Sequence, residues 1–342
     1  MIKLLYLSCH SILESDDLKI FREAGIDVFS PGAYWNPATG GAGMRPPMPE
    51  LQYDPEIVEI WQRHEEVHPE VDGKSYITKE IADRFDVIYV MHMPQWIESI
   101  WENVKHKRVI WRTIGQSVAS TEQRMKKFKD QGMEIVRYSP MEANIPGFAG
   151  QDGLIRFYKD PEEFREWNGK DERVITISQH MQERDSACNY TFFEEVTRPF
   201  DRLLIGPGSE HLPFGTGKIP FEEMKKCLRD NRVYFYTGTH PASYTLNFIE
   251  AWMTGIPMVC IGPKHGNANY FVDHDLYEIP SLIKHGVDGF VSDNIKELRD
   301  IIYDLTVNDE FARKVGAAGR RSAIKHFDKK MIMNAWKAYL ER

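Results

Sequence analysis

The sequence predicts an α/β protein built from two doubly wound domains, each a parallel sheet with helices on both faces. Its 342 residues are enough for two domains of ordinary size. In both halves, short apolar runs alternate with helical stretches, which is typical of parallel sheets. The turn-rich patch Asn168–Asp171 separates the halves. We therefore expect a first domain over residues 1–169 and a second over 170–328, facing each other across a cleft.

The strands are predicted from apolar runs that are too short for helices. Lys3–Ser8 is the first, and the next helix, Ser15–Glu23, carries Asp16 and Asp17 in its first turn and ends before Gly25. The other elements expected in this half are strands at Ile26–Phe29, Phe85–Met91, Val109–Arg112 and Glu134–Tyr138, and a helix at Ser120–Lys129. The second half repeats the pattern, with strands expected at Val174–Ile177, Leu203–Ile205, Val233–Thr237, Met258–Ile261 and Gly289–Val291.

Composition narrows the class of protein further. A hydrophobic content of 42% with 12% aromatic residues is that of a folded globular chain. The net charge of −8 disfavours nucleic acid as the main partner. The four cysteines lack metal-ligand spacing, and neither a signal peptide nor a long apolar run is present. We therefore expect a soluble, cytoplasmic protein with no transmembrane segment.

The stretch from residue 236 to 262 is the most informative part of the chain. Leu246–Thr254 reads as a helix that is apolar on nearly every side, yet it carries one acid, Glu250. A buried carboxylate needs hydrogen-bond donors from the protein or from a ligand. The preceding residues Ser243, Tyr244 and Thr245 form a capping loop whose N–H groups can hold an anion. Glu250 would lie roughly 8–10 Å from these groups.

That separation matches the distance from a nucleotide's diphosphate to its ribose hydroxyls. The helix is therefore a candidate nucleotide site, with phosphate at its tip on Ser243, Tyr244 and Thr245, and ribose on Glu250. Two simpler interpretations stay open. Glu250 can be a buried acid satisfied by the protein itself, and the loop can be an ordinary helix cap.

The same residues resemble the donor-sugar signature of group 1 (family 4) glycosyltransferases of the GT-B fold. The matching pieces are Asn247–Glu250, Gly255–Val259, His285–Val291 and the long run Asn294–Asp328, within a resemblance that covers about residues 173–328. It implies two Rossmann-like domains, with the nucleotide-sugar donor held by the second domain. It also implies that the last helix, within residues 329–342, packs back on the first domain.

The resemblance also implies the reaction. A sugar would pass from a nucleoside diphosphate, such as UDP or GDP, to a hydroxyl acceptor that is a glycan, a lipid-linked molecule or a small molecule. The anomeric configuration would be retained, with no metal or other cofactor required. One departure stands out: the family usually carries two acids in the pattern E-x7-E, and Ala242 takes the place of the first. This keeps a non-catalytic nucleotide-sugar binding protein as an alternative, and the acceptor could instead be a hydroxymethylated base in DNA.

Further site residues follow from the same resemblance. Gln179, His180 and Arg184 come after the first strand of the second domain, where the family places cations that face the leaving diphosphate. A cation there would stabilise the charge that develops on the diphosphate as the sugar leaves. Lys218 and Ile219 lie in a loop that resembles the one beside the nucleobase. The alternatives are a solvated helix residue for Arg184 and a plain surface turn for Lys218.

In the first domain, His92 follows one buried strand, and Arg112, Thr113 and Gln116 end another. Residues beyond the carboxyl ends of parallel strands line the binding crevice of such folds. The family often has a histidine near the donor sugar, so His92 is a candidate catalytic residue, with a structural histidine as the alternative. The long loop Pro31–Pro49 is expected to bind the acceptor or act as a lid, or else to be a mobile surface loop.

One rival motif points to a different class of enzyme. His64, Glu65 and His68 match H-E-x-x-H, the helix of zinc metallopeptidases. However, Pro69 follows His68 directly, so the helix is expected to end at the motif. No convincing third ligand follows in the sequence. We therefore favour packed or partly exposed histidines at a helix end and predict no metal site.

Overall fold

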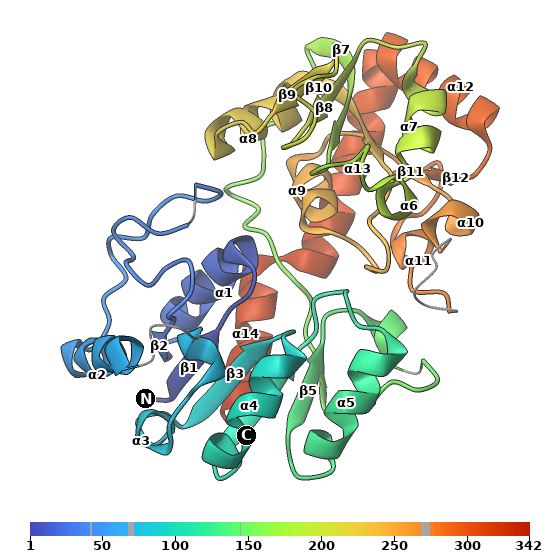
Figure 1. The fold of residues 1–342 in the computed structure, drawn as a ribbon. Helices are drawn as coiled ribbons and strands as arrows, with labels where there is room; N and C mark the ends of the chain where they lie inside the picture. The colour runs from blue at the N-terminus through green and yellow to red at the C-terminus, as the bar shows by residue number, and fades with distance from the viewer. Residues whose placement is uncertain (42, 68–71, 144, 268–273) are drawn as a thin grey trace. The chain divides into compact units, whose positions relative to one another are not determined.

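The computed structural model describes residues 1–41, 43–67, 72–143, 145–267 and 274–342. The chain forms two compact units (Figure 1). Unit 1 contains Met1–Arg156 and Lys330–Arg342, and unit 2 contains Phe157–Lys329. The division thus comes before the turn-rich patch 168–171 at which the sequence predicted it.

The segment from residue 157 to 169 belongs to unit 2 because its side chains and carbonyls are anchored there. The indole Nε1 of Trp167 donates to the Asn231 carbonyl at 2.7 Å. Arg320 donates through Nη2 to the Pro161 carbonyl at 2.6 Å and through Nη1 to the Phe164 carbonyl. These anchors lie far from the segment in sequence, so turn composition alone could not reveal them.

Unit 1 is a six-stranded parallel sheet in the order β2-β1-β3-β4-β5-β6, with helices on both faces. Its strands are β1 Lys3–Leu7, β2 Asp27–Phe29, β3 Val87–Met91, β4 Arg108–Arg112, β5 Glu134–Arg137 and β6 Gly153–Leu154. Its helices are α1 Ser11–Glu23, α2 Pro55–Val67, α3 Lys79–Ala82, α4 Pro94–Val104, α5 Ala119–Lys129 and α14 Lys329–Leu340, which enters from unit 2. The doubly wound architecture predicted for this half is confirmed.

Helix α1 begins earlier than the sequence predicted, at Ser11 instead of Ser15, because His10 acts as its N-cap. The imidazole Nδ1 of His10 accepts from the Leu13 N–H at 3.3 Å. Histidine is not among the preferred N-cap residues, so this helix start carries no strong signal in the sequence. The consequence is that Glu14, Asp16 and Asp17 are all buried on α1.

The last helix, α14, packs on the sheet of unit 1. The Trp336 ring lies 5.6 Å from the rings of both Phe21 on α1 and Tyr89 on β3. Beside them, the Asp17 carboxylate accepts from the Tyr6 hydroxyl at 2.7 Å and from the Tyr89 hydroxyl at 3.2 Å. Burial raises the pKa of Asp17 to about 6. The return of the chain thus closes unit 1 around a polar cluster within an aromatic core.

Unit 2 is a second six-stranded parallel sheet, in the order β12-β11-β10-β7-β8-β9. Its strands are β7 Asp171–Ile177, β8 Arg202–Ile205, β9 Gly215–Gly217, β10 Asn231–Tyr236, β11 Met258–Ile261 and β12 Phe290–Ser292. Its helices are α6 Asp185–Cys188, α7 Tyr190–Thr197, α8 Phe221–Asp230, α9 Leu246–Thr254, α10 Pro263–Gly266, α11 Ile279–Leu282, α12 Ile295–Val307 and α13 Asp309–Phe327. Every strand predicted for this half is present within a few residues of its expected ends.

The predicted helix Leu246–Thr254 is α9, and its surroundings explain its apolar composition. Residues 248–254 are all buried, and α9 packs closely against α13. Gly316 and Gly319 make this approach possible, because a Cβ at Gly316 would lie 2.2 Å from the Gly255 carbonyl oxygen. The helix ends at Gly255 in the left-handed conformation, with φ of 92°.

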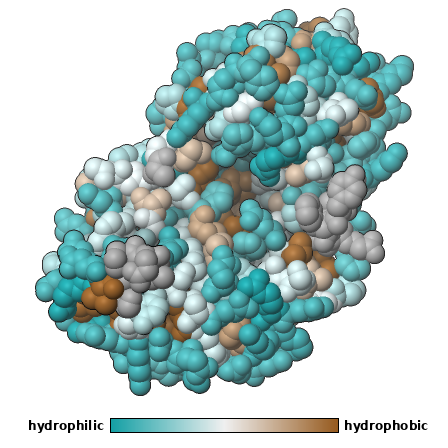
Figure 2. All heavy atoms as spheres, in the orientation of Figure 1, coloured by the Kyte–Doolittle hydropathy of each residue, from teal (hydrophilic) through white to brown (hydrophobic). Residues whose placement is uncertain are grey.

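Hydrophilic residues cover most of the visible surface of each unit (Figure 2). Within the described ranges, none of the helices combines the length and the apolar character needed to cross a bilayer.

Candidate functional site

The start of α9 lies at the carboxyl edge of the sheet of unit 2, where ligands bind in doubly wound folds. The Asn247 side chain donates to the carbonyl of Ile177, the last residue of β7, at 2.5 Å. The Thr245 hydroxyl donates to the hydroxyl of Tyr236, the last residue of β10, at 3.2 Å. The loops that follow β7 and β10, which both carry predicted site residues, are therefore fixed to one helix end.

Glu250 is buried, as the sequence predicted, and it is paired with a cation of the same unit. Its Oε1 lies 2.8 Å from the Nζ of Lys159, and both side chains are almost fully buried. This pairing supplies a protein partner for the acid, which was the alternative left open above. Ribose binding by Glu250 stays a prediction. Lys159 was missed in the sequence, although a lysine that directly follows the apolar residues Ile155, Phe157 and Tyr158 was an available signal.

Within the loop before α9, the side chains of Ser243 and Tyr244 are buried. The Tyr244 ring contacts Phe157 at 6.1 Å and Phe327 at 5.3 Å between centroids. Contact of these two residues with a ligand would therefore have to come from the backbone. Thr245, at the N-cap of α9, is only half-buried.

Gln179, His180 and Arg184 lie together after β7. The Arg184 guanidinium donates to the Gln179 carbonyl at 3.4 Å, and all three residues are exposed. His180 has a positive φ of 49°, an uncommon conformation for a residue with a side chain. Its N–H donates to the Pro207 carbonyl at 2.7 Å, which joins this turn to the loop after β8. The arrangement leaves the Arg184 cation accessible to an anion.

Lys218 and Ile219 follow β9 and lie beside the same turn. The Glu210 carboxylate accepts from the Gly208 N–H at 2.7 Å, and the N–H groups of Glu210, Gly208 and Lys218 hold its pKa below the usual value. Gly208 in turn contacts His180, since a Cβ at Gly208 would lie 2.7 Å from the imidazole Nδ1. Glu210 was missed in the sequence, because nothing in its spacing distinguishes it from a surface acid.

In unit 1, His92 follows β3 at the carboxyl edge of the sheet. Its φ is 59°, and its buried Nδ1 has no hydrogen-bond partner among the residues that the structure describes. Burial lowers its pKa, so the imidazole is neutral at neutral pH. Strained, partly buried residues of this kind cluster at functional sites. This geometry is compatible with a catalytic or ligand-binding histidine, and that role stays a prediction.

The predicted site residues at the end of β4 differ in their exposure to solvent. Gln116 is exposed, whereas Arg112 and Thr113 are buried. Arg112 lies over the Trp336 ring at 5.2 Å and donates to the Arg137 carbonyl at 2.8 Å, so it is a packing residue in unit 1. Thr113 donates to the Oε2 of Glu142 at 2.6 Å.

We expect Glu142 to make the stability of unit 1 depend on pH. Burial raises its pKa from 4.5 to about 7, so the folded protein keeps this proton to a higher pH than the unfolded chain does. The free energy of unfolding should therefore fall as the pH rises through this window, by at most about 3 kcal/mol for a shift of this size. Denaturant unfolding of wild type and Glu142→Gln between pH 5 and 8 measures this contribution. The variant should have a flatter profile, and equal slopes would contradict the assignment.

The loop Pro31–Pro49, expected to be a lid, an acceptor site or a mobile loop, is anchored at its start. The buried Glu14 carboxylate accepts from the N–H groups of Ala33 and Tyr34, both at 3.0 Å. The Tyr34 hydroxyl donates to the Pro46 carbonyl at 2.9 Å, which joins both ends of the loop. The Trp35 ring packs on Phe29 at 5.7 Å. These aromatic side chains are engaged in packing, and an acceptor-binding role stays a prediction.

The zinc motif falls at the end of α2, as expected, and His68 lies outside the described residues. The His64 imidazole faces the Gly73 carbonyl, with 3.3 Å from its Nε2 to the oxygen, and stacks on the Tyr76 ring. No group of three or more His, Cys, Asp or Glu side chains is placed to hold a metal ion in the part of the chain that the structure describes.

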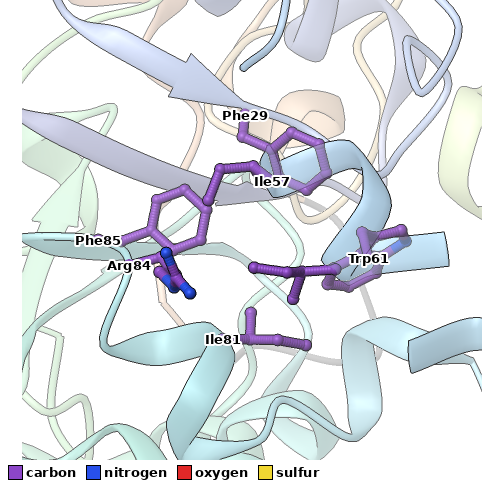
Figure 3. A pocket seen from close by; sticks show the side chains of 7 residues that line it. Phe29, Ile57, Trp61, Ile81, Arg84 and Phe85 are labelled. Atoms are coloured by element: carbon purple, nitrogen blue, oxygen red, sulfur yellow. The ribbon is translucent and has the colours of Figure 1, made fainter. Parts of the chain in front are cut away.

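The same face of α2 borders an apolar crevice that leaves no space for a water molecule (Figure 3). Its walls are the side chains of Phe29, Ile57, Ile60, Trp61, Ile81, Arg84 and Phe85. The only charged group among them, Arg84, is paired with Glu56 at 2.5 Å. The crevice is therefore part of the packing of α2 and α3 on the sheet, and it offers no ligand site.

The sequence and the structure of the chain can both be compared with those of known proteins. The sequence matches no model of a known protein family and no curated protein. Its structure, however, is similar to those of solved glycosyltransferases. Anabaena HepE in complex with UDP-glucose matches with a TM-score of 0.66 and 13% identity, over 100% of both chains.

Two further structures match over nearly the full length. Sucrose-phosphate synthase from Thermosynechococcus elongatus has a TM-score of 0.65 and 11% identity over 100% of this chain and 98% of its own. The β-glucosyltransferase of phage T4 has a TM-score of 0.57 and 13% identity over 98% and 99%. Together with the two parallel sheets, these matches show that the chain has the GT-B glycosyltransferase fold that its sequence motifs predicted.

Proposed function

We propose that the protein is a glycosyltransferase that moves a sugar from a nucleoside diphosphate to a hydroxyl acceptor. The observation that carries this proposal is the N-terminal end of α9, which forms hydrogen bonds with the last residues of β7 and β10 in a chain with the GT-B fold. The helix N-terminus suits the diphosphate because its N–H groups and dipole favour an anion. HepE, a structure with the same fold, was solved with UDP-glucose bound, which supports a UDP-sugar as the first donor to test.

In this proposal, unit 2 holds the donor. The backbone of Ser243, Tyr244 and Thr245 binds the diphosphate, and the Glu250 carboxylate accepts from the ribose hydroxyls. Arg184, which is exposed after β7, stabilises the charge on the departing diphosphate. The side of the nucleotide that faces away from α9 is lined by Gln179, His180, Lys218 and Ile219.

The reaction exchanges one C–O bond for another. The bond between the anomeric carbon and the diphosphate oxygen breaks, and a bond from the same carbon to the acceptor oxygen forms. The nucleoside diphosphate leaves with the bonding electrons, and its departing oxygen takes up the proton that the acceptor hydroxyl loses. We propose retention of configuration without a required metal, so that catalysis depends on positioning and on charge stabilisation. His92, with its neutral imidazole, is the candidate catalytic residue of unit 1.

Nucleotide-sugar binding should be visible as a stabilisation of the protein. A ligand at 100 times its dissociation constant raises the free energy of unfolding by about 2.7 kcal/mol. We expect one of UDP-glucose, GDP-mannose, ADP-glucose or TDP-glucose to raise the melting temperature, with UDP-glucose first. A screen in which none of the four raises it would contradict the proposal.

Turnover then separates an enzyme from a non-catalytic binding protein, which the alanine at position 242 keeps as the second candidate. Release of nucleoside diphosphate should depend on an added hydroxyl acceptor and persist in EDTA, and NMR of the product should reveal the retained anomer. DNA with a hydroxymethylated base, the alternative acceptor left open by the sequence, is one substrate in the panel. Donor binding without turnover on any acceptor would favour the binding protein.

A further inference from the structure

His240 is a buried histidine in the loop that joins β10 to α9, three residues before Ser243. The Asn189 side-chain Nδ2 lies 3.2 Å from the imidazole Nε2 of His240, and the backbone N–H of His240 donates to the Ala187 carbonyl at 2.8 Å. Both partners lie where α6 meets α7, in the segment that directly follows Arg184. His240 therefore joins the loop proposed to bind the diphosphate to the segment that carries the proposed cation.

The second contact of Asn189 decides which nitrogen of the ring carries the proton. The Nδ2 of Asn189 also donates to the Thr237 carbonyl at 2.9 Å, so the atom that faces the ring is the amide nitrogen and not the amide oxygen. The imidazole Nε2 must therefore accept, with the ring proton on Nδ1. Protonation of Nε2 would place its N–H against the N–H of Asn189 and break this contact.

The same ring also contacts the loop after β11. The backbone carbonyls of His265 and Gly266 in α10 accept from it, but burial has the larger effect and lowers the pKa of His240, so the ring is neutral at neutral pH. The charged side chains on the elements around it are exposed or engaged with other partners: Arg184 and Lys264 are exposed, Asp185 of α6 accepts from Thr191, Glu194 of α7 pairs with Arg202, and His265 of α10 pairs with Asp293.

We propose that His240 is a positioning residue of the donor site, whose neutral imidazole holds residues 241–245 and the Arg184 segment together so that both contact one diphosphate. This inference rests on the proposed function. A ring whose pKa is lowered in the joined arrangement favours separation of the two segments once it is protonated. The affinity for the donor should therefore fall as the pH falls and His240 becomes protonated.

Titration calorimetry with UDP-glucose at pH 7.5 and pH 5.5 tests the proposal. UDP-glucose is a better probe than UDP, because it has no terminal phosphate group that titrates in this range. The wild type should bind at least about threefold more weakly at pH 5.5. His240→Gln, whose amide oxygen can accept from Asn189 but does not titrate, should bind equally at both pH values. His240→Ala should bind about 3- to 10-fold more weakly than the wild type at pH 7.5, because the hydrogen bond is lost.

Asn189→Asp should reverse the sign of the pH dependence. A carboxylate can only accept, so it pairs with the protonated ring, and the affinity for UDP-glucose should rise as the pH is lowered. A residue that merely fills space would not produce this reversal. The control is His285→Gln, which removes an exposed imidazole that contacts the backbone of Val291 on the edge strand β12. It should keep the wild-type affinities at both pH values.

Amide hydrogen exchange without ligand measures the contact independently of nucleotide binding. Residues 237–245 and α6 should exchange faster in His240→Ala than in the wild type at the same pH. Unchanged exchange, a wild-type affinity for UDP-glucose that does not vary with pH, or a His240→Gln profile equal to that of the wild type would each overturn the proposal. A wild type that binds no nucleotide sugar, with exchange still faster in His240→Ala, would instead contradict the proposed function.

Discussion

Replacing Lys159 by methionine should destabilise unit 2 by about 3–5 kcal/mol. The substitution keeps most of the apolar stem but removes the ammonium group that lies 2.8 Å from the buried Glu250 carboxylate. A carboxylate that loses its cation in a buried site retains the full cost of leaving water. Because the two units can unfold separately, amide hydrogen exchange of α9 measured by mass spectrometry is the suitable readout.

Two further variants make this result interpretable. Lys296→Met removes a lysine whose ion pair with Asp300 is exposed, so exchange in α9 should not change. The double variant Lys159→Met/Glu250→Gln removes both charges and should recover much of the stability. Single and double variants that all resemble the wild type would mean that the pair contributes nothing to folding.

The double variant also separates the two roles of Glu250. If the acid only balances Lys159, the stable double variant should bind UDP as the wild type does. If it also accepts from ribose, as we propose, UDP affinity should fall although the fold is intact. Glu250→Ala alone would not distinguish these outcomes, because it leaves the Lys159 ammonium group buried beside an empty space.

In unit 1 we expect an effect of similar size from Arg137→Met, which should lower the free energy of unfolding of this unit by about 3–5 kcal/mol. Its Nη1 and Nη2 donate to the two oxygens of Glu122 at 2.6 and 2.7 Å, and neither side chain is exposed. The guanidinium also donates twice to the Gly150 carbonyl, and Glu122 accepts from the Ala149 N–H at 3.1 Å. One pair thus joins the end of β5, helix α5 and the segment after residue 148.

Arg137→Lys should recover only part of the loss, since an ammonium group cannot reproduce the paired geometry of the guanidinium fork. The matched control is Arg124→Met on the same helix as Glu122. Arg124 makes a similar pair with Glu98 at 2.5 Å, but both side chains are partly exposed, so its loss should have little effect. Hydrogen exchange of β5 and α5 measures both variants, and equal effects would contradict the role of burial.

Much of the fold could be predicted from the order of apolar runs. A strand buried on both faces needs a short continuous apolar stretch, and Val87–Met91 or Met258–Ile261 cannot be read as anything else once helices separate them. The boundary between units was misplaced because Asn168–Asp171 has turn composition, yet Trp167 and Asn168 hydrogen-bond to unit 2. Turn composition reports local backbone geometry, and a unit boundary depends on distant contacts.

The candidate site, like the fold, could be predicted only in part from the sequence. The sequence by itself determined the buried helix Leu246–Thr254, its single acid and its place after a central strand, because helical periodicity and strand order are local properties. Only the tertiary structure decided which groups surround that acid. Lys159 reaches Glu250 from a segment 91 positions away, and the partners of a buried charge are set by packing, which no spacing in the sequence records.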